Sequence, residues 1–175
     1  MPTMALEDLP VGVDAESMLE GLHRAHYRDL VRLAGLLLHD RGASEEVVQD
    51  AFVQLQLRWR RLRDPEKAAA WLRSAVLNGA RSRIRHLDVR RRHQPAPRGT
   101  AESAEDATLA GDARARMVDA LRTLPTRQRE AVVLRYYLEL SEAEMAAAMG
   151  ISAGSVKTHL HRGLQALHTQ LGDQR

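Results

Sequence analysis

The 175-residue chain contains no cysteine. Disulfide bonds and thiolate metal sites are therefore excluded, and a metal would need histidine or carboxylate ligands. The eight histidines are scattered and do not group with carboxylates at ligand spacing, so we expect no metal site and no cofactor. Acidic pairs such as Glu142 and Glu144 fit a solvated helix surface better than general acid–base catalysis, so we expect no enzymatic activity and no catalytic residues.

Long hydrophobic runs are also missing. A run such as "LAGLLL" (residues 33–38) is far shorter than the roughly 20 apolar residues that cross a bilayer as a helix. The opening segment "MPTMALEDLPVGVDAES" lacks the basic stretch and apolar core of a secretory signal. We therefore expect a cytoplasmic protein without membrane insertion.

Aromatic residues make up only 3% of the chain, and glycine and proline number 11 and 6. Strands favour aromatic and β-branched residues, whereas the abundant Ala, Leu and Arg favour helices, so we predict an all-α fold. Basic residues outnumber acidic ones 26 to 23, and lysine occurs only at Lys67 and Lys157. With a net charge of +3, the placement of the arginines matters more than the total.

Helical periodicity divides the chain into two blocks. Three helices are expected within residues 17–94, where Gly42 and Ser44 separate the first two and Asp64–Pro65 begins the third. Residues 95–113 combine prolines, glycines and acidic residues without an apolar period, which predicts a flexible linker. Residues 114–175 form the second block, and residues 1–16 an N-terminal tail. The sequence thus predicts two small helical domains joined by a linker.

The most specific local pattern lies between residues 141 and 167. Ser141 and Glu144 have the spacing of a capping box, and Gly150 suits the left-handed residue that ends a helix. Because Ser152 can cap a second helix directly afterwards, the segment predicts a helix-turn-helix. One stripe of that second helix is apolar and comprises Val156, Leu160, Leu164 and Leu167.

The opposite face of the same helix is rich in hydrogen-bond donors for base edges and phosphates. It carries Ser155, Thr158, His161, Arg162 and Gln165, with Lys157 on its flank. The pattern indicates a helix that reads DNA. The alternative is an amphipathic hairpin whose polar face is merely solvated.

A second basic cluster lies in the N-terminal block. Six arginines occur within twelve residues, opposed only by Asp88: Arg81, Arg83, Arg85, Arg90, Arg91 and Arg92. Such density is typical of phosphate binding, although a solvated basic surface is the common alternative. Two nucleic-acid surfaces joined by a linker would let one molecule grip two DNA segments at once.

Two longer segments carry a family resemblance. "SEEVVQDAFVQLQLRW" followed by "AWLRSAVLNGARSRIRH" resembles region 2 of bacterial RNA polymerase sigma factors. "LRTLPTRQREAVVLRYYLELSEAEMAAAMGISAGSVKTHLHRGLQAL" resembles region 4. The short chain, with only these two regions and a linker, is similar to the extracytoplasmic-function type. The resemblance covers roughly residues 17–93 and 114–171.

The resemblance implies a factor that binds core RNA polymerase, recognises promoter DNA at two elements and promotes transcription initiation. In region 4 it assigns reading of the upstream, minus-thirty-five element to Lys157, Thr158, His161 and Arg162, with Ser155 near the phosphates. Gln165 lies on the same polar face. The preferred upstream sequence does not follow, because the family varies at the position of His161.

In region 2 the resemblance implies reading of the downstream, minus-ten element as single-stranded DNA. Asn78 matches a position lining the pocket for a flipped base, "DPEKAAA" matches the specificity loop, and Trp71 matches a tryptophan of the melting helix. Arg81, Arg83 and Arg85 would follow the DNA backbone. Between Asp64 and His86 this helix has only one aromatic residue, which points to weaker melting or to an easily opened promoter.

The same resemblance assigns Gln49 and Asp50 to docking on the clamp coiled coil of the largest polymerase subunit, with Phe52 packed beneath. Trp59 is expected in the core, with a polymerase contact as its alternative role. An anti-sigma protein or a partner regulator stays an open partner by analogy with relatives.

Two other function classes compete with this interpretation. A dimeric helix-turn-helix repressor would bind a palindrome without polymerase, but it would leave the "VVQDAF" helix and the arginine helix without a role. A DNA-processing enzyme such as a recombinase would need a phosphate loop, a nucleophile or a carboxylate triad, and the N-terminal block shows none of these.

Overall fold

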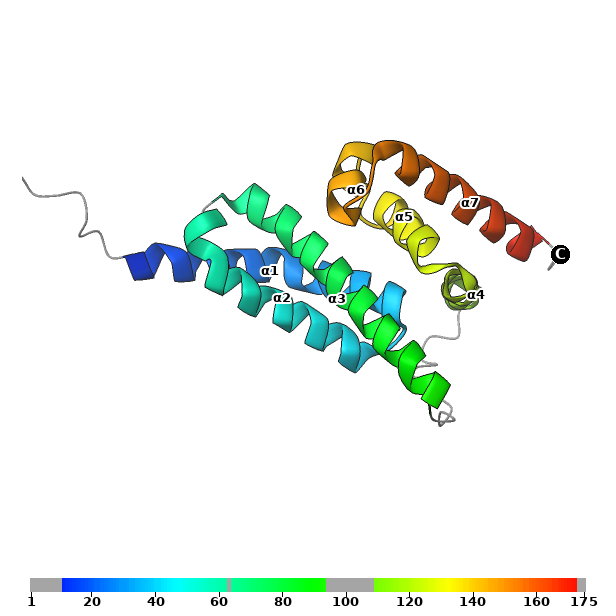
Figure 1. Ribbon diagram of the computed structural model, residues 1–175, viewed down its shortest axis with the longest axis horizontal. Helices are drawn as coiled ribbons and strands as arrows, with labels where there is room; N and C mark the ends of the chain where they lie inside the picture. Colours follow the sequence, from blue (N-terminus) through cyan, green and yellow to red (C-terminus); the bar gives the residue numbers. More distant parts are fainter. Residues whose placement is uncertain (1–10, 63, 94–108, 173–175) are drawn as a thin grey trace, which may run out of the picture.

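The computed structural model describes residues 11–62, 64–93 and 109–172, and these form seven α-helices without a strand. The prediction of an all-α fold is therefore confirmed. The first bundle consists of α1 (Val11–Leu38), α2 (Arg41–Leu62) and α3 (Pro65–His93). The second bundle consists of α4 (Leu109–Thr123), α5 (Thr126–Tyr136), α6 (Glu142–Met149) and α7 (Ala153–Gly172). Figure 1 shows the two bundles side by side.

The first bundle packs around aliphatic side chains such as Leu33, Leu55 and Leu72, which have no exposed surface. Trp59 is also buried at 8% exposure, so its prediction as a core residue is confirmed. Helix α1 begins at Val11, so the last six residues of the expected N-terminal tail are helical.

The turns of the first bundle follow from capping side chains. The Asp40 carboxylate accepts a hydrogen bond from the Ala43 backbone N–H at 2.9 Å, so Gly42 lies within the first turn of α2 and does not interrupt it. At the next turn the Asp64 carboxylate accepts from the Lys67 N–H at 3.4 Å, and Pro65 is the first residue of α3. A fixed φ and a missing N–H suit proline to that position.

The helix-turn-helix forms as its sequence predicts. Ser141 and Glu144 make a reciprocal capping box, and their contact lowers the pKa of the Glu144 carboxyl below its ordinary value. Gly150 has a φ of 66° and ends α6 in the left-handed conformation. The Ser155 N–H then donates to the Ser152 hydroxyl at 3.1 Å at the start of α7. Residues 95–108 of the expected linker lie outside the described residues, and α4 already begins at Leu109.

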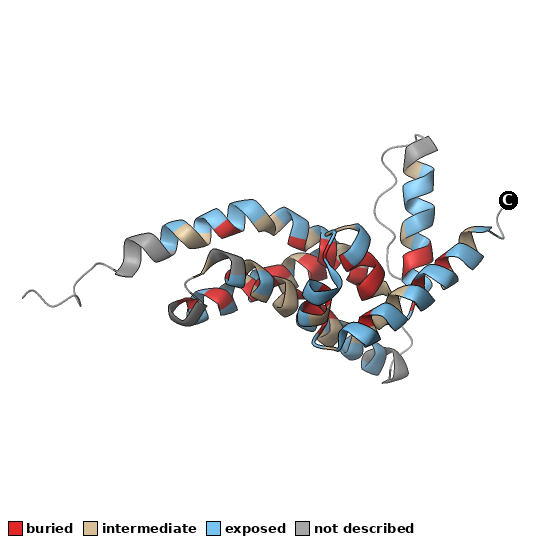
Figure 2. Ribbon diagram, turned by 90° about the horizontal axis from the view of Figure 1, so that it is seen from above, coloured by how far each residue is buried: buried red, intermediate tan, exposed pale blue. Residues whose placement is uncertain are grey.

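The two bundles are in contact with each other. Helix α3 packs against α6, and α1 packs against α5. Buried residues of both bundles belong to one hydrophobic cluster, and Figure 2 shows them gathered where the helices meet. Within the described residues, none of the helices is long and apolar enough to cross a membrane.

Candidate nucleic-acid and partner interfaces

Helix α7 presents one polar face to solvent. Val156 is completely buried and Leu167 nearly so, which turns the other side of the helix outward. Leu164, although on the same stripe, stays partly exposed. The outward side chains are Lys157, Thr158, His161, Arg162 and Gln165, all exposed, and Ser155 at its edge is half-buried. The structure therefore gathers the six residues predicted for the upstream element on one helix.

Glycine allows α7 to approach α5 closely. A Cβ atom at Gly163 would lie 2.9 Å from Val132 Cγ2 and 3.2 Å from the Gln128 carbonyl oxygen. Since the carbonyl belongs to the helix backbone and cannot move away freely, no larger residue fits without shifting α7. This close approach fixes the orientation of the polar face.

Three of the polar side chains on α7 have local partners. Lys157 Nζ lies 3.3 Å from the Glu142 carboxylate of α6. The Thr158 hydroxyl donates to the Gly154 carbonyl at 3.0 Å, and the Ser155 hydroxyl is 2.9 Å from that of Ser152. The Lys157 pair is exposed, and such pairs contribute little to stability, so an external anion can compete for the ammonium.

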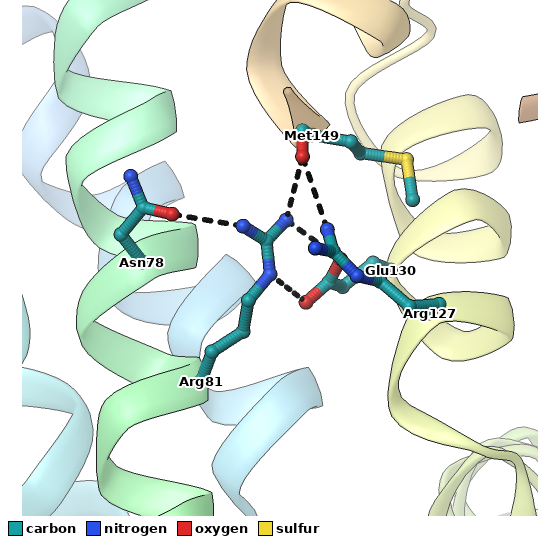
Figure 3. Close-up of polar contacts among 5 residues, drawn as sticks. All are labelled: Asn78, Arg81, Arg127, Glu130 and Met149. Carbon is teal, nitrogen blue, oxygen red and sulfur yellow. Dashed lines mark hydrogen bonds and ion pairs between the residues drawn. The ribbon is translucent and has the colours of Figure 1, made fainter. Parts of the chain in front are cut away.

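The arginines of α3 are not equivalent. Arg81 forms an ion pair with Glu130 of α5, and the shortest distance, from Nε to Oε1, is 2.6 Å (Figure 3). Arg83 lies 3.2 Å from the exposed Glu46 carboxylate of α2. Arg85 is exposed on the same helix. Arg90, Arg91 and Arg92 lie within α3, but their side chains lie outside what the structure describes.

A polar groove of about 540 Å³ runs along the surface where α2 and α3 meet. Its lining includes Asp50, Trp71, Asn78 and Arg83, so it brings a residue predicted to dock on polymerase together with three predicted to contact DNA. The Arg58 guanidinium stacks over the Trp71 ring at 5.5 Å from its centroid. This cation–π interaction joins α2 to α3 at one end of the pair of helices that form the groove.

The three residues predicted to dock on polymerase lie on α2. Gln49 and Asp50 are exposed, and Phe52 is half-buried. The Phe52 ring lies 5.0 Å from the His23 ring of α1, which stacks on Tyr27 at 4.4 Å. Phe52 thus anchors α2 to α1 while Gln49 and Asp50 face outward.

Sequence inspection missed two charged residues of α5. Glu130 is 1% exposed and lies in a buried run with Ala131 and Val132. Arg129 donates to the Leu37 carbonyl of α1 at 2.6 Å and to the carbonyls of Arg122 and Leu124. The only signal in the sequence is that Arg129 and Glu130 stand directly before the apolar run of residues 131–134. That position does not distinguish a buried charge from a solvated one.

His39 lies at the α1–α2 turn beside Arg129, with a φ of 55°. Neither ring nitrogen has a hydrogen-bond partner among the described residues. Burial, together with the nearby charges of Arg129 and Arg122, lowers the pKa of His39 to about 4. The imidazole is therefore neutral at pH 7, and it is held in a backbone conformation that glycine adopts more readily.

We expect His39→Gly to stabilise the chain at pH 7 by roughly 1 kcal/mol, because it relieves the left-handed backbone and removes a half-buried ring whose nitrogens have no hydrogen-bond partner among the described residues. The folded pKa of about 4 lies below the ordinary value of 6.5, so the unfolded chain binds more protons between these values. The free energy of unfolding of the parent should therefore fall as the pH drops through that range. Urea unfolding at pH 7 and pH 5 measures both effects.

His168→Gln, an exposed position on α7, serves as the control and should leave the pH dependence unchanged. The assignment is wrong if His39→Gly loses as much stability as the parent between pH 7 and pH 5.

A second groove, of about 900 Å³, is largely apolar and lies where α1 meets α4, α5 and α7. Met117, Tyr136 and Leu164 on its walls are exposed apolar side chains. Arg32 and Arg114 add positive charge to the lining. Because α1 belongs to the first bundle, both bundles contribute to this groove.

Comparison with known families gives two matches along the chain. Residues 22–90 match the family model for sigma-70 region 2, and residues 114–167 match the model for sigma-70, region 4. The first match spans most of the first bundle, and the second runs from α4 into α7. Within the described residues, no group of three or more His, Cys, Asp or Glu side chains could hold a metal ion.

The chain is 35% identical over 143 residues to the RNA polymerase sigma-E factor of Streptomyces coelicolor. The aligned residues cover 81% of this chain and 79% of that protein. It is 29% identical over 151 residues to the ECF RNA polymerase sigma factor SigM of Mycobacterium tuberculosis, with 86% and 76% covered. The sigma factor RpoE of Bartonella quintana, solved in complex with the anti-sigma factor NepR, has a similar fold, with a TM-score of 0.69. That structural match has 21% identity and covers 93% of this chain and 99% of the other.

Proposed function

The chain belongs to the extracytoplasmic-function sigma factors of bacterial RNA polymerase, and we propose how its surfaces divide the work of such a factor. A sigma factor binds core RNA polymerase and promoter DNA and directs transcription initiation. We assign residues 17–94 to region 2 and residues 114–175 to region 4. The proposal includes no enzymatic step or cofactor, and it places the protein in the cytoplasm, where polymerase and promoter meet.

We assign reading of the upstream element to the polar face of α7. The observation that carries this assignment is the outward row of Lys157, His161 and Arg162 on a helix whose opposite side is locked into the core. Helices of this kind enter the major groove with exposed donors facing the base edges. Thr158 and Gln165 extend the same surface, and Ser155 is placed for a phosphate contact.

For the downstream element we propose α3, with Asn78 and Trp71 toward an unpaired base and the arginines toward phosphates. The groove between α2 and α3 supports this division, because Asn78 and Trp71 share its lining with Arg83. Gln49 and Asp50 then dock the outer side of α2 on polymerase, and Phe52 supports them from beneath.

Arg162→Ala should weaken promoter binding by about 1–3 kcal/mol, because an arginine can make paired hydrogen bonds to a base. The loss should appear on the native promoter and be much smaller when the upstream element is scrambled. Run-off transcription with core polymerase, together with binding to both promoter fragments, measures it. Arg116→Ala removes an exposed arginine from α4 of the same bundle and serves as the matched control.

Full activity of Arg162→Ala on the native promoter would overturn the role given to this residue. An equal loss on native and scrambled promoters would show a phosphate contact in place of base reading.

For the groove between the bundles we propose an amphipathic helix of an anti-sigma protein as occupant. Its apolar lining suits the buried side of such a helix, and Arg32 and Arg114 suit acidic residues at the rim. The Bartonella quintana relative, crystallised with its anti-sigma factor, makes this class of partner the natural candidate. Because both bundles form the walls, such a partner would bind their packed arrangement.

A further inference from the structure

Arg81 connects the two bundles through a buried, two-pronged contact. Its Nε and Nη2 atoms donate to the two carboxylate oxygens of Glu130, at 2.6 and 2.8 Å. Nη2 also lies 3.4 Å from the Met149 carbonyl at the end of α6, and Nη1 donates to Asn78 Oδ1 at 2.8 Å. Figure 3 shows α3 on one side of this cluster and α5 and α6 on the other. All three guanidinium nitrogens thus donate hydrogen bonds, and the Arg81 side chain is only 16% exposed.

The acceptor side of this cluster is built into the second bundle. Glu130 is 1% exposed, and Arg127 Nη1 lies 3.3 Å from its Oε2 atom and 3.0 Å from the Met149 carbonyl. A buried carboxylate needs charged partners to offset the loss of hydration. Arg127 belongs to the same helix and supplies one, whereas Arg81 comes from the other bundle. The ion pair with Arg81 therefore depends on the packing of the bundles.

A carboxylate and a DNA phosphate present the same target to arginine. Both accept two parallel hydrogen bonds from the planar guanidinium. Glu130 therefore occupies the position on Arg81 that a phosphate oxygen pair would take. Asn78 is engaged as well, since its carbonyl oxygen already accepts from Arg81.

We infer that Arg81 and Glu130 form an intramolecular latch, in which the second bundle occupies Arg81 of the proposed downstream DNA surface, while Asn78 and Arg85 of that surface stay exposed. This inference rests on the proposed role of α3. When the bundles separate, DNA phosphate replaces the Glu130 carboxylate on Arg81. The polar face of α7 is exposed in the latched state, so the latch blocks one phosphate contact of the downstream surface and leaves the upstream surface open.

The wider interface supports a latch at this point. Arg129 of α5 binds the Leu37 carbonyl of α1, and the Tyr137 hydroxyl lies 3.4 Å from the Asp29 carboxylate. These contacts do not involve residues assigned to DNA or polymerase. Arg81 is thus the point in the described contacts between bundles at which packing competes directly with a proposed DNA contact.

The test measures opening and DNA binding separately. Since the chain has no cysteine, cysteines introduced at the exposed positions Gln56 of α2 and His168 of α7 can carry a donor and an acceptor dye. Energy transfer between them reports the separation of the bundles in the full chain. Binding of a short single-stranded oligonucleotide with the downstream element, without polymerase, reports access to α3.

Glu130→Gln should lower energy transfer and raise affinity for the oligonucleotide, by up to about tenfold if the closed state is favoured by about ten to one. Arg81→Gln should lower energy transfer equally without the gain in affinity, because it removes the group that binds phosphate. Glu139→Gln removes the same charge from an exposed position of the second bundle and should change neither signal.

Unchanged energy transfer in both Glu130→Gln and Arg81→Gln, with parental helical content, would overturn the latch. If Glu130→Gln unfolds the second bundle, Arg81→Gln decides the question, since the substituted residue lies in the first bundle and Glu130 keeps its contact with Arg127. Lower energy transfer in both variants without any gain in oligonucleotide affinity for Glu130→Gln would keep the mechanical latch and overturn the assignment of α3 to downstream DNA.

Discussion

Asp50→Arg is expected to reduce binding to core RNA polymerase by on the order of 100-fold, since a like charge placed in a complementary interface costs several kcal/mol. Asp50 is exposed on the outer side of α2, one residue beyond Gln49. The substitution places a cation where the proposed docking surface presents an anion. Helical content should not change, because the side chain is not part of the core.

Asp50 also lines the groove that contains Asn78 and Arg83, so its replacement can affect DNA contacts as well. Polymerase binding must therefore be measured without promoter, for instance by fluorescence anisotropy of labelled factor. Glu20→Arg makes the same change of charge at an exposed position of α1 and is the matched control. Undiminished holoenzyme formation by Asp50→Arg would remove this helix surface from the polymerase interface.

Local features of the second bundle could be predicted from the sequence. Ser141, Glu144, Gly150 and Ser152 act within a few residues of their own position, and each has the conformation or partner expected of it. Caps and left-handed glycines depend on backbone geometry that nearby residues determine. The predicted stripe and polar face of α7 followed from the same local periodicity.

The contact between the bundles could not be predicted in this way. It depends on Arg81 meeting Glu130, 49 positions away, across a linker that suggested independent domains. In the sequence, Arg81 belongs to a run of arginines that resembles a phosphate-binding surface, and Glu130 resembles an ordinary solvated residue of an amphipathic helix. Only tertiary packing distinguishes a buried ion pair from two surface charges, because periodicity carries no information about distant partners.

The positions at which α1 and α4 begin were also not predicted correctly from the sequence. The opening residues of α1 and α4 each contain a glycine and an acidic residue, and the prediction placed them in a tail and a linker. The helices nevertheless include Val11 and Leu109. A single glycine within a helix costs only about 1 kcal/mol, which the packing of the following turns can offset.

Asn78→Ala and Arg85→Gln should separate base reading from phosphate binding on α3. Arg85 is the cleaner choice among the predicted phosphate ligands, because Arg81 is held by Glu130 and Arg83 is paired with Glu46. Removal of one phosphate-binding side chain should reduce the slope of log affinity against log salt by about 0.7 to 0.9. Arg85→Gln should therefore weaken binding on all promoters alike and lower the slope by roughly that amount.

Asn78→Ala should instead change which downstream base is preferred, with the salt slope nearly unchanged, because an amide releases no counterions. Open-complex formation by holoenzyme, on promoters varied at each downstream position and at several salt concentrations, distinguishes the two. Using holoenzyme matters, because in the free chain Arg81, which donates to Asn78, is also held by Glu130 of the second bundle. On a promoter with a pre-melted bubble, Arg85→Gln should still bind less tightly, since the phosphates of the single strand remain to be bound. A uniform decrease in affinity in Asn78→Ala, with base preference untouched, would place the base pocket on another residue.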